Sequence, residues 1–511
     1  MKKPSNLSSF SRNVISYALL QVVTLLVGLV LPRFFLEVYG SEINGVISTA
    51  NSFISYFSYI EAGIGAALMH ALFKPLAVHD VSQINGIVSY SAKEYRRISC
   101  IYFVLVVLLS SAFPHITYET SLATWEFSGL FFVIGLYSAI DFYTMAKYRV
   151  LLLADKKEYI LSIAGIAAQL VRFVLVWIAL TMELNVIFVK CLPIATLMVR
   201  TVILKLYIRK NYPEVVFKAK KLIRPTEDVG KRWDALFLQI SINASMTFPT
   251  IVISQICGYV QANVFAIYYL VCSAVISLVS SLSSGIAPIL GQAIAKGEDV
   301  SRKYNLYEFF IAVVLTVVFS TAALLIVPFV SIYTNVVSDA DYINNTFAYL
   351  ILVWGAIHSY RIPYTAVINA TAIYDKMRKL NITNLILLFV SCLGFTYFLG
   401  IQGTIISMVL VAMHRNLSFL FILNKYSSFI NVKTSFFRMI AMIILLSAFF
   451  VLGIFINGKI KIVAFPALCI YAVICFAISS IIVLVFFSII NKALFKNILE
   501  YLRSICRKRN A

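Results

Sequence analysis

Basic side chains occur inside stretches of this sequence that are apolar enough to cross a membrane. Arg172 and Arg361 are the clearest cases, because each lies near the middle of such a stretch. A charge at the centre of a membrane helix costs about 2.5–3.5 kcal/mol on insertion scales, so it usually faces a protein interior or a wet cavity. Guanidinium groups bind phosphate oxygens through paired hydrogen bonds. These two arginines are therefore the first candidates for binding an anionic substrate.

The other ionisable residues of the apolar stretches are more often basic than acidic. The predicted interior is therefore net positive, which favours an anion over a cation. The further candidates for anion binding are Arg33, Lys190, Arg200 and His358. The first three have an alternative interpretation, since a long basic side chain can extend from a membrane helix to the interface.

Two acidic residues, Glu61 and Asp141, also lie within the apolar stretches. Each can form a structural ion pair, for example with Arg172 or Arg361, or it can bind a coupling ion, which would be H⁺ or Na⁺. Helix capping explains the polar residues that follow Asp375 better than a sodium site does.

The composition is that of an integral membrane protein. Of the 511 residues, 61% are hydrophobic and 13% are charged. The apolar runs are about 20 residues or longer, which a helix needs to cross about 30 Å of hydrocarbon, and the alternation of a membrane β-barrel is missing. We therefore predict an all-α membrane protein. Its first run, from Arg12 to about Leu36, is too long for a signal peptide, so we expect it to be retained.

Apolar runs bounded by charges or turn residues predict fourteen membrane helices. With an even number of spans both termini lie on one side, and the segments on that side hold about 36 of the 43 lysines and arginines, so the positive-inside rule predicts cytoplasmic termini. Orientation thus explains the net charge of +21, and no nucleic-acid partner is expected. The helices are expected at 12–37, 45–70, 97–116, 125–148, 159–180, 186–208, 234–256, 262–288, 305–332, 346–370, 381–400, 403–424, 438–456 and 463–490.

The predicted helices form two sets of six, followed by two extra helices. The second helix of each set carries a Gly-Ile pair followed by Leu and Lys at the same offsets. A parallel internal repeat with a substrate site between its halves would show this pattern. The expected domains are an N-terminal lobe at 1–208, a cytoplasmic linker at 209–233, a C-terminal lobe at 234–424, and a final helix pair with a basic tail at 425–511.

The N-terminal part of the chain carries a series of recognisable short motifs. Over residues 10–97 the sequence resembles bacterial polysaccharide repeat-unit flippases of the Wzx type, which belong to the multidrug/oligosaccharidyl-lipid/polysaccharide (MOP) exporter superfamily. Beyond this region only the hydropathy and the number of segments agree. The motifs are Pro32-Arg33, Tyr39-Gly40-Ser41-Glu42-Ile43-Asn44-Gly45, Glu61-Ala62-Gly63-Ile64-Gly65 and Lys74-Pro75-Leu76-Ala77.

The resemblance implies a flippase in the bacterial cytoplasmic membrane. Its substrate would be an undecaprenyl-diphosphate-linked oligosaccharide repeat unit, moved from the inner to the outer leaflet by alternating access for capsule, exopolysaccharide or O-antigen assembly. A polysaccharide polymerase and the chain-length machinery would be its protein partners. Two alternatives stay open: a flippase for the peptidoglycan lipid precursor, and an extrusion antiporter for cationic drugs or toxins.

Sequence signatures of catalysis are absent. The chain has no HExxH, GxSxG or glycine-rich P-loop motif, and its eight cysteines show no CxxC or Cys/His spacing that could hold a metal. Membrane polymerases and glycosyltransferases resemble chains with a large extracytoplasmic loop, which this sequence lacks. We therefore expect neither an enzyme nor a cofactor.

Overall fold

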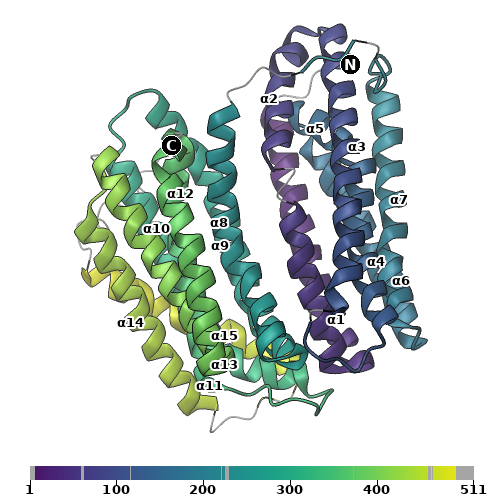
Figure 1. Cartoon of the computed structure of the whole chain (residues 1–511). Helices are drawn as coiled ribbons and strands as arrows, with labels where there is room; N and C mark the ends of the chain where they lie inside the picture. Colours follow the sequence, from purple (N-terminus) through teal and green to yellow (C-terminus); the bar gives the residue numbers. More distant parts are fainter. Residues whose placement is uncertain are drawn as a thin grey trace. The chain divides into compact units, whose positions relative to one another are not determined.

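The computed structural model describes residues 6–58, 62–115, 117–219, 221–224, 229–371, 373–427, 429–457, 462 and 464–490. Within these ranges the regular secondary structure is helical and no strand occurs (Figure 1). In chain order the elements are α1 (Asn6–Ser58), α2 (Ala62–Val78), α3 (Val81–Ala112), η1 (Phe113–His115), α4 (Thr124–Thr144), α5 (Ala146–Ala154), α6 (Glu158–Thr181), α7 (Val186–Asn211), α8 (Val229–Ile256), α9 (Tyr259–Ala295), α10 (Ser301–Thr334), α11 (Asn345–Tyr360), α12 (Ile362–Thr371), α13 (Tyr374–Tyr426), α14 (Val432–Asn457) and α15 (Phe465–Ile490).

Eleven helices in the described part of the chain are long and apolar enough to cross a membrane. Two of them, α1 and α13, have 53 residues each and contain one non-helical glycine, Gly40 and Gly400 respectively. The predicted division between 381–400 and 403–424 thus falls at Gly400. Helices α11 and α12 together match the span predicted at 346–370. The prediction of an all-α, multispanning membrane protein is confirmed.

The chain divides into two compact units, unit 1 at residues 1–264 and unit 2 at residues 265–511. The division falls within α9, so this helix contributes to both units. The lobe and linker boundaries expected from the sequence remain a prediction.

The described residues of unit 1 include two apolar cores. The first lies among α1 to α7 and includes Tyr102, whose side chain is fully buried. Because a buried hydroxyl needs a partner, Tyr102 donates a hydrogen bond of 3.0 Å to the carbonyl oxygen of Ile54. The second core includes Leu31 and Ala50, which lie before and after Gly40. Both halves of α1 therefore pack in one region of the unit.

In unit 2, α10 packs against α14 and α15, and α11 packs against α13 (Figure 1). The core includes the fully buried side chains of Phe319 and Trp354. The hydroxyl groups of Tyr349 and Ser447 lie 2.6 Å apart and join α11 to α14. In a membrane the lipid chains are as apolar as the helix surfaces, so apolar contact alone gives helices little reason to associate. Polar contacts such as this one therefore add to the packing between helices.

Helix α13 is a helical hairpin that turns at a single residue. Gly400 has φ 61° and ψ −146°, a backbone conformation that side chains with a Cβ rarely adopt. Side-chain hydrogen bonds then pair residues on both sides of Gly400 in antiparallel order. The pairs are Thr396 with Thr404 (2.7 Å between hydroxyl oxygens), Ser391 with Ser407 (2.5 Å) and Asn384 Oδ1 with His414 Nδ1 (2.8 Å).

The hairpin leaves no room for a side chain at Gly403. A Cβ atom there would lie 1.9 Å from the carbonyl oxygen of Phe395. We predict that Gly403→Ala destabilises the protein by about 1–3 kcal/mol, the usual penalty for overpacking. Gly394→Ala is the matched control, because a Cβ at Gly394 would meet nothing within 4 Å. Thermal unfolding in detergent measures both variants, and equal midpoints for them would contradict the tight hairpin.

Candidate functional site

In unit 1 four of the candidate residues come from three helices: Asp141 from α4, Arg172 from α6, and Lys190 and Arg200 from α7. Asp141 of α4 accepts a hydrogen bond of 3.4 Å from Arg200 Nη1 of α7, and the two side chains are 19% and 24% exposed. Tyr137 of α4 interacts electrostatically with Asp141, Arg172 and Arg200. The fold thus brings together groups that lie far apart in the sequence, and it pairs Asp141 with Arg200.

Arg172 of α6 is half-buried and has a different environment. Its Nε atom is buried with no hydrogen-bond partner among the described residues, and no described carboxylate lies within ion-pair distance. Lys190 of α7, which carries a charge of the same sign, interacts electrostatically with Arg172. An arginine held beside a lysine without a carboxylate favours an anion at this place.

Lys190 stacks on an aromatic ring of α1. Its Nζ atom lies 3.8 Å from the centre of the Phe35 ring, which is cation–π distance. Arg33 lies two residues before Phe35 in α1 and is half-buried. It is not part of the group described around Arg172. Glu61, predicted as a pair partner or coupling residue, lies outside the described residues.

In unit 2, His358 and Arg361 form one contact at the end of α11. Arg361 Nη2 lies 3.2 Å from His358 Nε2. Because a guanidinium group donates hydrogen bonds and never accepts them, Nε2 is the acceptor and the imidazole carries its hydrogen on Nδ1. His358 is only 1% exposed. The pair therefore presents a neutral histidine oriented by an arginine.

Several hydrogen-bond donors around this pair have no acceptor within the described chain. They are His358 Nδ1, Arg361 Nε and the indole nitrogen of Trp354, whose ring centre lies 5.0 Å from that of His358. Arg415 of α13, 1% exposed, adds a second positive charge that interacts with Arg361. An excess of buried donors and positive charge suits an anion and opposes a bare sodium ion.

A buried ion pair in unit 2 escaped the sequence analysis. Arg438 of α14 donates a hydrogen bond of 3.0 Å to Glu308 of α10 and one of 2.6 Å to Asn305, and the Arg438 and Glu308 side chains are 1% and 3% exposed. Tyr364 of α12 also donates to Glu308, at 3.4 Å. Both charges are compensated inside the protein, so this pair joins three helices and offers little to a ligand.

Breaking this pair is predicted to be costly. Arg438→Met leaves the carboxylate of Glu308 buried without its cation, which costs about 3–5 kcal/mol in comparable buried pairs. The double variant Arg438→Met with Glu308→Gln removes both charges and is expected to recover much of the loss. Thermal unfolding of the purified variants tests this, and a single variant as stable as the double variant would contradict it.

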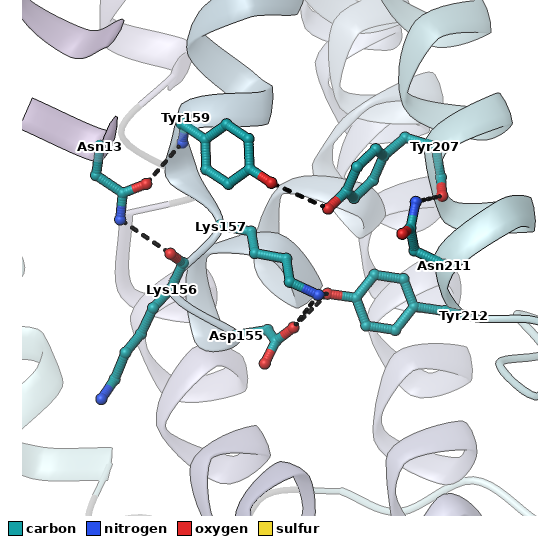
Figure 2. Close-up of polar contacts among 8 residues, drawn as sticks. All are labelled: Asn13, Asp155, Lys156, Lys157, Tyr159, Tyr207, Asn211 and Tyr212. Atoms are coloured by element: carbon teal, nitrogen blue, oxygen red, sulfur yellow. Dashed lines mark hydrogen bonds and ion pairs between the residues drawn. The ribbon is translucent and has the colours of Figure 1, made fainter. Parts of the chain in front are cut away.

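A polar cluster joins three elements at the end of unit 1 that holds the start of α1 (Figure 2). Asn13 donates to the carbonyl oxygen of Lys156 and accepts from the backbone of Tyr159, at 2.9 and 3.0 Å. Tyr212, just after α7, donates to Asp155, which also forms an ion pair of 2.8 Å with Lys157. Burial and then the bond to Asp155 raise the pKa of Tyr212 above its usual range. The cluster fixes the turn between α5 and α6.

The arrangement of these basic groups has the chemistry of anion binding. No group of three or more His, Cys, Asp or Glu side chains that could hold a metal occurs within the described ranges. Each unit contains positive charge that is only partly compensated among the described residues, around Arg172 within α6 and around Arg361 between α11 and α12.

Comparison with solved structures defines the fold. The chain is 15% identical to a multidrug resistance MATE family transporter of the MOP superfamily in an inward-facing conformation, with a TM-score of 0.59 over 81% of this chain and 95% of the transporter. It is 12% identical to the lipid II flippase MurJ in an inward closed conformation, with a TM-score of 0.60 over 94% and 99% of the two chains. A eukaryotic MATE transporter, AtDTX14, is 14% identical, with a TM-score of 0.57 over 86% and 99%.

The fold is therefore that of MATE transporters and MurJ. At 12–15% identity this likeness defines the fold. No profile of a known protein family matches the sequence, and no curated protein sequence matches it significantly.

Proposed function

We propose that this protein is a flippase that moves an undecaprenyl-diphosphate-linked oligosaccharide repeat unit from the inner to the outer leaflet of the bacterial cytoplasmic membrane. The cycle is alternating access, with the prenyl chain remaining in lipid while the diphosphate and sugars cross in a protein-lined path. The product supplies capsule, exopolysaccharide or O-antigen assembly.

One observation carries the proposal. Arg172 lies within the candidate membrane span of α6, and Arg361 lies between α11 and α12, where the sequence predicts a single span at 346–370. Each has a buried Nε atom without a partner among the described residues. Neither has a described carboxylate at ion-pair distance. A diphosphate would supply the missing negative charge, which hydrocarbon could not. The N-terminal motifs and a fold shared with the lipid II flippase MurJ support a lipid-linked substrate.

The cation antiporter is the less favoured alternative. A carrier of cations needs carboxylates that are available to the substrate. Asp141 and Glu308 instead pair with Arg200 and Arg438. The charges of Arg172 and Arg361, with which no described carboxylate forms an ion pair, are positive.

Removing the two central charges is predicted to stop export. In the double variant Arg172→Gln with Arg361→Gln, each lost charged hydrogen bond costs about 1.5–3 kcal/mol, which is roughly tenfold or more per residue. We therefore expect surface glycan to fall by at least about tenfold while the protein still reaches the membrane. Quantifying surface glycan and membrane-inserted protein in the same cells measures both.

Arg302→Gln is the control for the loss of an arginine charge, because it removes one such charge from an exposed position at the start of α10. Normal export by this variant with loss in the double variant supports the assignment. Full export by the double variant would remove Arg172 and Arg361 from the substrate path.

A deletion strain separates the substrate classes. Accumulation of the lipid-linked repeat unit on the inner leaflet supports the proposed flippase. Accumulation of the peptidoglycan lipid precursor supports the second flippase hypothesis, and loss of cation efflux with normal surface glycan supports the antiporter. The same proposal includes coupling to H⁺ or Na⁺, which dissipation of each gradient in turn would identify.

A further inference from the structure

Four basic side chains meet at one end of unit 1, and the sites described above use none of them. They are Arg96 of α3, Lys147 of α5, Lys205 of α7 and Lys218, which follows α7; we call them the basic cluster. Lys147 interacts electrostatically with each of the other three. Its Nζ atom lies 5.1 Å from the centre of the Tyr148 ring and 5.9 Å from that of Phe217.

Specific contacts hold the cluster together. The segment after α7 lies along α3, where Asn85 donates to the carbonyl oxygen of Glu214 at 3.0 Å and accepts from the backbone of Val216 at 2.8 Å. Ser89 accepts from the backbone of Ala219 at 2.8 Å. This docking places Phe217 against Tyr148, with ring centres 5.1 Å apart, and so brings Lys218 toward Lys147.

The fold thus places four positive charges, those of the basic cluster, close enough to repel one another. Burial and then the charges of Arg96, Lys205 and Lys218 lower the pKa of Lys147. No described carboxylate forms an ion pair with Lys147. Like charges that interact in this way are destabilising unless an anion compensates them.

Two exposed apolar stripes end at the basic cluster. On α7, Met198 and Val202 are 70% and 52% exposed and share a helix face with Lys205, at spacings of seven and three residues. On α3, Phe103 is 41% exposed and lies seven residues from Arg96, on the same face. In a membrane protein such stripes face hydrocarbon. The cluster is therefore positioned where a polar headgroup adjoins its own hydrocarbon chain.

We propose that the basic cluster binds the phosphate group of a membrane lipid, whose hydrocarbon chain lies along the apolar stripe of α7. Phospholipids and prenyl diphosphates share this chemistry, a phosphate on a long apolar chain. The proposal does not depend on the transported substrate. If the ligand is a prenyl diphosphate, the cluster is a first contact for the substrate; if it is a phospholipid, it anchors unit 1 at the interface.

Native mass spectrometry of the full-length protein tests this with four probes: phosphatidylglycerol, phosphatidylcholine, farnesyl diphosphate and inorganic phosphate. The variant Arg96→Gln with Lys147→Gln is expected to bind phosphatidylglycerol or farnesyl diphosphate roughly tenfold more weakly than the unmodified chain. Preference for one of these two probes identifies the source of the phosphate. Lys147→Arg keeps the charge and is expected to keep binding.

The matched control is Lys93→Gln with Arg97→Gln. It removes the same charge from exposed positions of the same helix that are not among the charges acting on Lys147. Equal losses in the control and test variants would overturn the site in favour of general surface charge, as would unchanged binding in the test variant. Inorganic phosphate bound as tightly as the lipids would overturn the lipid assignment. If the test variant does not fold, Lys205→Gln with Lys218→Gln probes the same cluster.

Discussion

An ionised side chain inside a membrane must obtain its solvation from the protein, and this constraint separates the charges of this chain into two kinds. Arg438 and Glu308 satisfy each other within a dry contact among three helices. Arg172 and Arg361 have no carboxylate of the described residues at ion-pair distance, although their Nε atoms, like that of Arg438, are buried without a partner in the described chain. The first kind stabilises the fold, and the second has unused capacity to bind an anion.

The fold alone does not decide what crosses the membrane. The same architecture occurs in MATE multidrug transporters and in a lipid II flippase, and functions are carried by sites rather than by folds. Here the deciding property is the sign of the charge that remains after internal pairing. Asp141 forms an ion pair with Arg200. Arg172 instead interacts electrostatically with Lys190, and Arg361 with Arg415, so in both cases the neighbouring charge has the same sign. A positive remainder in each unit is the physical argument for an anionic headgroup.

Hydropathy predicted the helices well because crossing hydrocarbon requires long apolar runs, and even the closely spaced pair before and after Gly400 was separated correctly. It could not predict which helix faces meet. Glu308 and Arg438 are 130 residues apart, and each lies among apolar neighbours without a local sign of its partner. The break between α11 and α12 at Arg361 was missed because the run 346–370 is predominantly apolar, so hydropathy treats it as one span.

The one-residue turn of α13 has a consequence for how the protein is made. Only Gly400 separates the two arms, so no loop between them could stay in water after the first arm has inserted. We therefore expect the two arms to enter the bilayer together. Hydrogen bonds between side chains of the two arms also join them directly. Biogenesis of this part of the chain therefore favours insertion of the two arms as a pair.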